Sequence, residues 1–224
     1  MKSSGKVGKI ISFFILGILS AVCVMPIFWA VCTSFKTESE IKIKGFGFLP
    51  QKWTIENYLN ILKNTDNAPI VRWFCNSMFI ATIVAVLTVF LVALTAYGYS
   101  RLQFKYRDQL FFFIMAVSLF PSVTNIIPLY QVISWFDWVN TPVAMILPGL
   151  GGVTNVFLAR QFLLGVPKDF DEAAKIDGAG EFDVFFRIIL PVMKPILTVV
   201  ALFSFTGSWN DFLWPTIVFN DVEK

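Results

Sequence analysis

The sequence predicts an all-α integral membrane protein, and three observations support that prediction. The chain of 224 residues is 56% hydrophobic and 17% aromatic, which is well above the apolar share of an ordinary soluble domain. Its mean hydropathy is +0.70. Several windows are almost free of Asp, Glu, Lys and Arg, and they are long enough to cross about 30 Å of hydrocarbon as helices.

We expect five transmembrane spans, one in each of these windows. They lie near residues 10–35, 73–100, 109–136, 138–159 and 195–219. The first follows three lysines and so resembles a secretory signal, but its apolar run is too long and lacks a small-x-small cleavage site. We therefore interpret it as a retained helix that anchors the chain from its start.

Basic residues near the ends of the spans predict the orientation of the chain. Lysine and arginine favour cytoplasmic loops, and here they precede the first span and separate the second span from the third. The residues concerned are Lys2, Lys6, Lys9, Arg101, Lys105 and Arg107. This bias predicts a cytoplasmic N-terminus, and it also places residues 160–194 in the cytoplasm.

Composition excludes several classes of function. The chain has no histidine, so the commonest general base and metal ligand are missing, and we expect no metal or cofactor site. The three cysteines form no CxxC pair, which favours buried apolar roles over the alternative of a disulfide or metal site. A net charge of +3 with scattered basic residues argues against nucleic-acid binding. No GxxxxGK[ST] loop is present, so the chain is not itself a P-loop ATPase.

The cytoplasmic segment 160–194 is predicted to form two short helices joined by a turn. Pro167 suits a first helical turn, Asp169 or Asp171 can cap the first helix, and Gly178 is a natural left-handed stop. The second helix is expected from about residue 181 to 190, where Pro191 interrupts it. Its apolar face follows three- and four-residue spacing and consists of Phe182, Phe185, Phe186 and Ile189.

Small residues near the end of the first of these helices form a candidate binding surface. Ala173, Ala174 and Gly178 leave a patch almost without side chains, on which another protein can approach the backbone closely. Glu172 lies beside the patch and can pair with a basic residue of that partner. The alternative is a surface hairpin that only connects two spans.

The same residues carry a family resemblance. Glu172-Ala173-Ala174, three residues, Gly178, nine residues and then Ile188-x-Leu190-Pro191 resemble the EAA loop of permease subunits of ATP-binding-cassette importers. The match holds at every position that the pattern specifies, and it points to the maltose-type, sugar-importing branch. The resemblance continues in order through PIFWAVCTSFK (26–36), FGFLPQKWTIENY (46–58), AYGYSRLQFKYRD (96–108), IIPLY (126–130), FLARQFLLGVPKDFDEAA (157–174) and WNDFLWP (209–215).

This resemblance implies a type I importer permease fold in a prokaryotic plasma (inner) membrane. The implied partners are a second homologous permease, two ATPase subunits, an extracytoplasmic sugar-binding protein and membrane lipid. The short helix is then similar to a coupling helix that docks in a cleft of an ATPase subunit, through Glu172, Ala173, Ala174, Asp177 and Gly178. Such permeases commonly have six spans, so we expect the last span and its cytoplasmic tail to be missing from this chain.

Polar residues inside the predicted spans are candidates for the translocation path. Polar groups are costly in hydrocarbon unless they are paired or face a cavity. The candidates are Asn125, Asn155, Asn210 and Asp211. The alternative for each is an ordinary hydrogen bond between helices.

Two other classes of function are open from the residues alone. A self-sufficient channel or secondary carrier needs no ATPase, but an ion-coupled carrier usually has ionisable groups at mid-membrane. The predicted spans contain only Asp211, close to an outer end. A scaffold that holds a cytoplasmic partner at the membrane would transport nothing. The complete EAA pattern favours a transport subunit that is not itself an enzyme.

Overall fold

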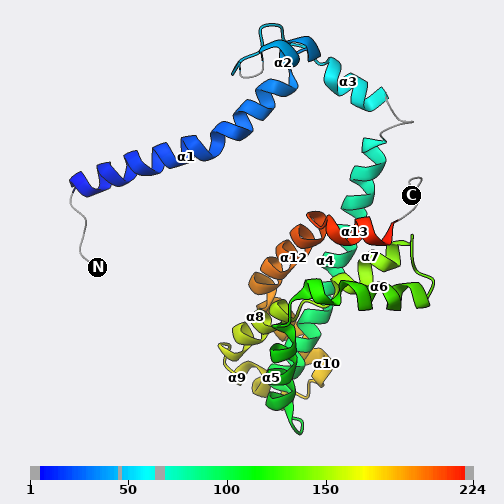
Figure 1. Ribbon diagram of the computed structural model, residues 1–224. Helices are drawn as coiled ribbons and strands as arrows, with labels where there is room; N and C mark the ends of the chain where they lie inside the picture. Colours follow the sequence, from blue (N-terminus) through cyan, green and yellow to red (C-terminus); the bar gives the residue numbers. More distant parts are fainter. Residues whose placement is uncertain (1–5, 45–46, 64–68, 220–224) are drawn as a thin grey trace. The chain divides into compact units, whose positions relative to one another are not determined.

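The computed structural model describes residues 6–44, 47–63 and 69–219 of the chain (Figure 1). Every regular element in these residues is helical, as the sequence predicts. The chain divides into two compact units, Met1–Trp73 and Phe74–Lys224. Each unit is described separately below.

The first unit consists of one long helix followed by two short ones. Helix α1 (Lys6–Ser34) has 29 residues, and its apolar side chains are exposed along almost its whole length, as expected of a helix that contacts lipid. Helices α2 (Glu38–Lys44) and α3 (Glu56–Lys63) follow it. The side-chain amide of Asn57 donates hydrogen bonds to the carbonyl oxygens of Ser34 (2.9 Å) and Lys36 (2.8 Å). These bonds satisfy backbone groups at the end of α1 that have no partner within the helix.

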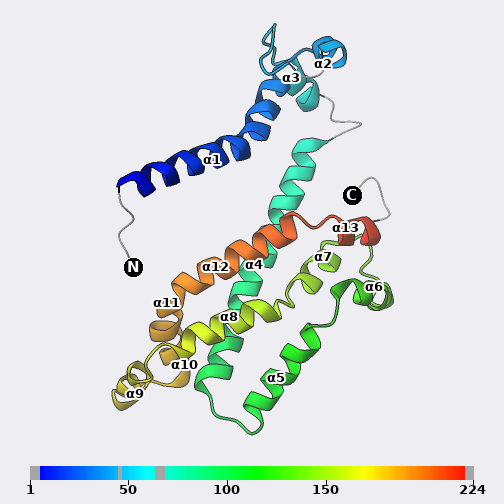
Figure 2. The ribbon, with the colours of Figure 1, turned by 60° about the vertical axis from the view of Figure 1, so that its left-hand side comes forward.

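The second unit is built around helix α4 (Ile70–Arg101), which has 32 residues and places all but its first turn in this unit. Its buried face is composed mainly of small residues at helical spacing, which allow neighbouring helices to approach closely. Figure 2 shows α8 and α12 side by side in this unit. The other elements are α5 (Arg107–Ser118), a 3₁₀ turn (Ser122–Asn125), α6 (Ile126–Trp135), α7 (Pro142–Gly149), α8 (Val153–Leu164), α9 (Asp169–Ile176), α10 (Glu181–Asp183), a π turn (Val184–Ile189), α11 (Leu190–Val192), α12 (Lys194–Trp209) and α13 (Leu213–Val218).

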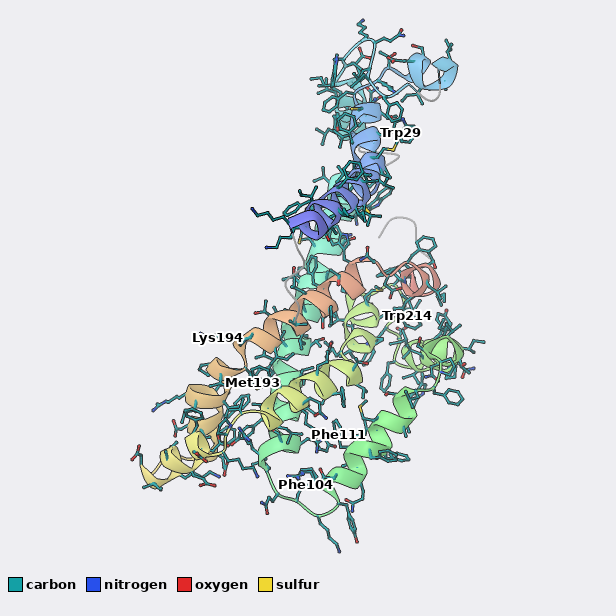
Figure 3. The ribbon with its side chains drawn as sticks, turned by 90° about the vertical axis from the view of Figure 1, so that its left-hand side faces the viewer. Trp29, Phe104, Phe111, Met193, Lys194 and Trp214 are labelled. Carbon is teal, nitrogen blue, oxygen red and sulfur yellow. The ribbon has the colours of Figure 1, made fainter. Side chains whose placement is uncertain are left out.

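Two apolar clusters stabilise the second unit. The larger cluster joins α4, α8, α9, the π turn and α12, and Leu163, Ile189 and Met193 are completely buried in it. The smaller cluster joins α6, α7 and α13. Within it, the indole N–H of Trp214 donates a hydrogen bond of 2.8 Å to the carbonyl oxygen of Ala144 (Figure 3). The burial of Trp214 therefore leaves its one polar group satisfied.

Arg160, which lies one turn before the end of α8, links three helices. Its guanidinium donates to the carbonyl oxygen of Tyr99 (3.3 Å) and forms an ion pair with Asp108 at 2.7 Å. The same guanidinium lies 4.2 Å from the ring centroid of Phe111, a cation–π contact. These contacts fix the ends of α4, α5 and α8 to one another.

The predicted spans coincide with helices, but three long helical segments are bent. Two helices, residues 8–34 of α1 and the whole of α4, are long and apolar enough to cross a membrane unbroken. Three bent pairs raise the possible number to five, with bends of 88° after α5, 41° after α7 and 75° after α11. These numbers of spans and bend angles concern the described residues only. The division into five spans stays a prediction.

Proline and glycine account for the first two bends. Helix α5 ends before Pro121, which lacks an N–H group and disfavours a helical conformation in the residue before it. The bend between α7 and α8 falls at Gly151 and Gly152.

The helix that begins at Glu181 differs from its predicted form. Pro191 does not end it, because the chain stays helical to Val192 and bends at Met193. The turn Val184–Ile189 just before the proline is a π-helix. A proline ring clashes with the carbonyl group four residues earlier in a regular α-helix, and the wider π turn provides room for it. The predicted apolar face is divided, since Phe185 and Ile189 are buried whereas Phe182 is 78% exposed.

Candidate coupling surface and translocation cleft

Helix α9 contains most of the predicted coupling residues. Three acidic residues, Asp169, Asp171 and Glu172, lie in its first turn, where negative charge is favourable to the helix dipole. Neither Asp169 nor Asp171 caps the helix, because the N-cap position is Lys168 and no side chain bonds there. The predicted cap is therefore wrong, although both carboxylates sit at the expected end.

Gly178 ends this helical segment in the left-handed conformation that the sequence predicts. Its φ is +86°, and its N–H donates to the carbonyl oxygen of Lys175 at 3.1 Å. The N–H of Ala179 donates to the carbonyl oxygen of Ala174 at 2.9 Å. A side chain added at Gly178 would meet no other atom of the chain within 4 Å. The requirement for glycine here thus arises from the backbone conformation and not from crowding within the chain.

The five predicted coupling residues occupy two different faces. Glu172, Ala173, Asp177 and Gly178 are exposed. Ala174 is 8% exposed and belongs to the larger apolar cluster, so it faces the interior of its own chain. Their contact with a partner stays a prediction.

Sequence reasoning missed two apolar residues on the same helix. Phe170 is 54% exposed and Ile176 is 85% exposed, although α9 has a buried face available. The sequence held a signal for Ile176, which is neither three nor four residues from the inward-facing Asp171 and Ala174, but not for Phe170, which lies four residues before Ala174. Together with Ala173 they give the exposed side of α9 an apolar character suited to a protein partner.

Polar contacts attach the loop around α9 to the end of α4. Arg101 Nε lies 2.8 Å from Asp171 Oδ2, with only 4% and 12% of the two side chains exposed. A second nitrogen of Arg101, Nη2, donates to the carbonyl oxygen of Val166 at 2.9 Å. Burial raises the pKa of the Asp171 carboxyl, and the positive charge of Arg101 opposes that rise.

Glu181 provides a second attachment. The hydroxyl of Tyr97 donates to Glu181 Oε2 at 2.6 Å, and Lys175 Nζ contacts Glu181 Oε1 at 2.5 Å. One carboxylate therefore joins α4, α9 and α10. The ring of Tyr97 also packs against the ring of Phe185, with the two centroids 5.2 Å apart.

A separate cleft of about 440 Å³ lies among α4, the 3₁₀ turn, α6, α7, α8, α12 and α13. Two of the predicted path residues, Asn155 and Asp211, line it. Asn155 Nδ2 donates to Ser204 Oγ at 3.2 Å, and Asp211 Oδ1 accepts the backbone N–H of Trp214 at 3.2 Å. Both residues thus bring a polar side chain to the wall of the cleft.

The other two path candidates lie elsewhere. Asn125 is exposed and is not among the residues that line the cleft. Asn210 is also outside the lining and donates to the carbonyl oxygen of Thr206 in its own helix at 2.9 Å. This last bond lies within one helix, so it differs from the predicted alternative of a bond between helices.

Small polar residues of the cleft were also missed from the sequence. Ser204, Gly207 and Ser208 of α12 all line it. Their three- and four-residue spacing places them on one helix face, and that spacing is the signal that was available. This stripe places two serines and a glycine at the wall of the cleft.

Gly149 lets α7 approach α4 closely at the wall of the cleft. A Cβ atom added to Gly149 would lie 3.1 Å from Val84 Cγ1. We therefore expect Gly149→Ala to lower the thermal unfolding midpoint of the purified protein in detergent by about 2–12 °C, since overpacking costs about 1–3 kcal/mol. In a Val84→Ala background the same substitution should cost little. Equal losses in both backgrounds would contradict this explanation.

Comparison with known proteins identifies the family. Residues 91–223 match the family of binding-protein-dependent transport system inner membrane components. The chain belongs to this family. The permease is 32% identical over 202 residues to the arabinooligosaccharides transport system permease protein AraQ of Halalkalibacterium halodurans, a match that covers 89% of this chain and 72% of AraQ. It is 34% identical over 216 residues to the diacetylchitobiose uptake system permease protein NgcG of Streptomyces coelicolor, covering 96% and 70% of the two chains.

A solved structure confirms the predicted fold. The permease matches a chain of a bacterial ABC transporter involved in the import of the acidic polysaccharide alginate, with a TM-score of 0.85 and 20% sequence identity. The match covers 99% of the permease and 77% of that chain. At this identity the likeness concerns the fold, which is the type I importer permease fold predicted from the sequence.

Membership in the family establishes the general role of the chain. It is a non-catalytic transport subunit of an ABC importer in the inner membrane, and ATP is hydrolysed by a separate subunit. Its family works together with that ATPase and with a substrate-binding protein. Family membership therefore argues against the two alternative functions, a self-sufficient channel or carrier and a scaffold.

Proposed function

We propose that the permease serves an ATP-driven importer of sugars or oligosaccharides. The observation that carries this proposal is its match, over 89% and 96% of its length, to permeases named for the transport of arabinooligosaccharides and diacetylchitobiose. The cleft is lined mainly by apolar side chains, but Ser122, Asn155, Ser204, Ser208 and Asp211 also line it and can hydrogen-bond to a hydroxyl-rich solute after it leaves water. The sugar itself is not assigned.

The proposed assembly contains two permeases, two ATPase subunits and one extracytoplasmic sugar-binding protein, with the N-terminus of this chain in the cytoplasm. Closure of the ATPase pair on ATP moves the coupling helices and switches the permeases between inward- and outward-facing states. Alternating access of this kind needs two global states whose balance the ATPase can shift.

In this proposal α9 is the coupling helix. Glu172 meets a basic residue of the ATPase, while Ala173, Asp177 and Gly178 allow its surface to approach the backbone. Ala174 lies on the opposite, buried side of α9, where its small side chain lets the helix pack against the rest of its own chain. The exposure of the first four residues and of Phe170 and Ile176 supports this arrangement.

The proposed path for the sugar involves Asn125, Asn155, Asn210 and Asp211. The cleft supports Asn155 and Asp211 most directly, since both line it. Asn125 lies in the 3₁₀ turn Ser122–Asn125, whose first residue also lines the cleft. Asn210 adjoins Asp211 in the chain, so both are assigned to the outer part of the path.

Affinity purification tests the assembly, and uptake tests the substrate class. The chain, tagged at its N-terminus, is purified from its native membrane in mild detergent, and accompanying proteins are identified by mass spectrometry. We expect an ABC ATPase and a second permease.

The complex is then reconstituted with its binding protein, and uptake of radiolabelled oligosaccharides, amino acids and peptides is compared. ATP-dependent uptake of peptides or amino acids alone would overturn the sugar assignment.

Asn155→Leu should reduce uptake because it replaces a polar group of the cleft by an apolar one. We expect a loss of about tenfold, equivalent to about 1.4 kcal/mol, with the ATPase still bound. The matched control is Thr154→Leu, since Thr154 is exposed next to Asn155 and does not line the cleft. Equal effects of the two substitutions would remove Asn155 from the path.

A further inference from the structure

The attachment of the coupling loop to α4 has a feature that goes beyond docking of the ATPase. Arg101 is the last residue of α4, and Tyr97 lies one turn before it on the same face. Arg101 holds Asp171 at 2.8 Å and Tyr97 holds Glu181 at 2.6 Å. One helix end thus holds the loop on both sides of the Gly178 turn.

The first of these contacts is a buried ion pair and not a hydrogen bond, because Arg101 Nε and Asp171 Oδ1 have no hydrogen-bond partner among the described residues. Only 4% of the Arg101 side chain and 12% of the Asp171 side chain are exposed. Removing one partner of such a pair leaves the other charge buried without compensation, which is strongly unfavourable. Within the packed loop, replacement of either partner alone is therefore expected to be disruptive, whereas an exchange that keeps both charges need not be. Lys175 strengthens the second contact because its ammonium group pairs with Glu181 from α9 itself.

The connections of α9 would otherwise transmit little force. A short segment after Leu164 precedes the helix, and the left-handed Gly178 follows it. Turns and glycines of this kind absorb displacement by changes in φ and ψ. Direct contacts between α9 and α4 bypass these connections.

Helix α4 also connects this attachment to the cleft. Helix α4 is continuous from Ile70 to Arg101, and Val84 in its middle lines the cleft next to Gly149. A displacement of Arg101 is therefore carried by a rigid helix to a wall of the cleft. Helix α4 has no break between these two positions, and Gly98, the glycine it contains there, lies between Tyr97 and Arg101 and so does not separate Tyr97 from Val84.

We propose that Arg101, Tyr97, Asp171 and Glu181 form a clamp that makes α9 and α4 move as one body during transport. The proposal rests on the proposed function, since it takes α9 as the helix that meets the ATPase. These four are positioning residues that face their own chain and contact neither the ATPase nor the sugar. The clamp converts movement at the ATPase surface into movement of the cleft wall.

Charge exchange gives the first test. In the reconstituted complex, Arg101→Glu and Asp171→Arg are each expected to lower sugar uptake per ATP hydrolysed by at least about tenfold, equivalent to about 1.4 kcal/mol. The double exchange should recover most of that ratio, whereas two independent structural defects would add. Uptake per ATP at the level of the unaltered complex in both single variants would overturn the clamp.

Reversible cross-linking gives a second test that does not depend on the fit of exchanged charges. Arg101→Cys and Asp171→Cys are combined in a protein whose native cysteines, Cys23, Cys32 and Cys75, are replaced by serine. A short bifunctional methanethiosulfonate reagent then joins positions 101 and 171, and a reductant releases them. We expect uptake per ATP to be low in the reduced protein and restored by the cross-link. Loss of uptake on cross-linking, recovered on reduction, would show that α9 and α4 separate during transport and would overturn the proposal.

Co-purification separates failure of the clamp from failure of the proposed function. If the clamp is wrong but the coupling surface is right, the ATPase still co-purifies with the unaltered permease and Glu172→Lys still reduces uptake by at least about tenfold. If the coupling surface is wrong, Glu172→Lys leaves uptake intact whatever the clamp variants do.

The matched control for the clamp is Arg187→Glu, because Arg187 pairs with Asp183 on the same loop but is 81% exposed.

Discussion

Glu172→Lys is expected to reduce ATP-dependent uptake by at least about tenfold while the permease remains in the membrane. Glu172 is exposed in the first turn of α9, so its replacement disturbs no buried contact of the chain. If a basic residue of the ATPase faces it, reversal of charge places two like charges together, which costs several kcal/mol. A loss of about 1.4 kcal/mol already corresponds to a factor of ten.

Uptake and the amount of co-purified ATPase should be measured together for this variant. Glu172→Gln is expected to show an intermediate loss, because it removes attraction without adding repulsion. The matched control is Asp183→Lys, an acidic residue of the same loop whose exposed pair with Arg187 contributes little to stability. Undiminished uptake by Glu172→Lys would remove this residue from the coupling surface.

The sequence was sufficient to predict the two long unbroken helices, because hydrophobicity and length determine what a bilayer accepts. The predicted spans 10–35 and 73–100 correspond closely to α1 and α4. The later windows were predicted as single spans, yet the chain bends within or beside them. Composition does not distinguish a straight helix from a bent one, since both present the same apolar window.

The helix end at Gly178 and the bend at Met193 illustrate two kinds of local signal. A glycine after an acidic, alanine-containing helix is a specific sign of a left-handed stop, and the structure has φ of +86° there. Pro191 was a weaker sign. A proline can be accommodated by a π turn that keeps the chain helical, and the bend then falls two residues later.

The clamp could not be predicted from local patterns, because its partners are far apart in the sequence. Arg101 and Asp171 are each ordinary charged residues near a membrane end, and Tyr97 resembles any aromatic residue of a span. Their pairing depends on how α9 packs against α4. Similarly, Asn155 and Asn125 looked equivalent in the sequence, and only Asn155 lines the cleft.

Gly178→Trp is expected to abolish most uptake, by two separable effects. A residue other than glycine in the left-handed region costs about 1–2 kcal/mol, which would disturb the end of α9. The indole would also cover the surface on which the ATPase is proposed to approach, since Gly178 is exposed and no atom of its own chain lies within 4 Å of an added Cβ. Together these effects should lower uptake by at least about tenfold.

Two smaller substitutions distinguish strain from crowding. Asparagine tolerates the left-handed conformation, so Gly178→Asn should keep uptake within about threefold of the unaltered complex, or about 0.7 kcal/mol. Valine is strained there because of its branched Cβ, and it adds little bulk, so Gly178→Val should lie between Asn and Trp. If Val is as harmful as Trp, the backbone conformation is the whole requirement. If Val is as mild as Asn, close approach of the partner is the requirement. A fully active Gly178→Trp would contradict both explanations and the coupling surface with them.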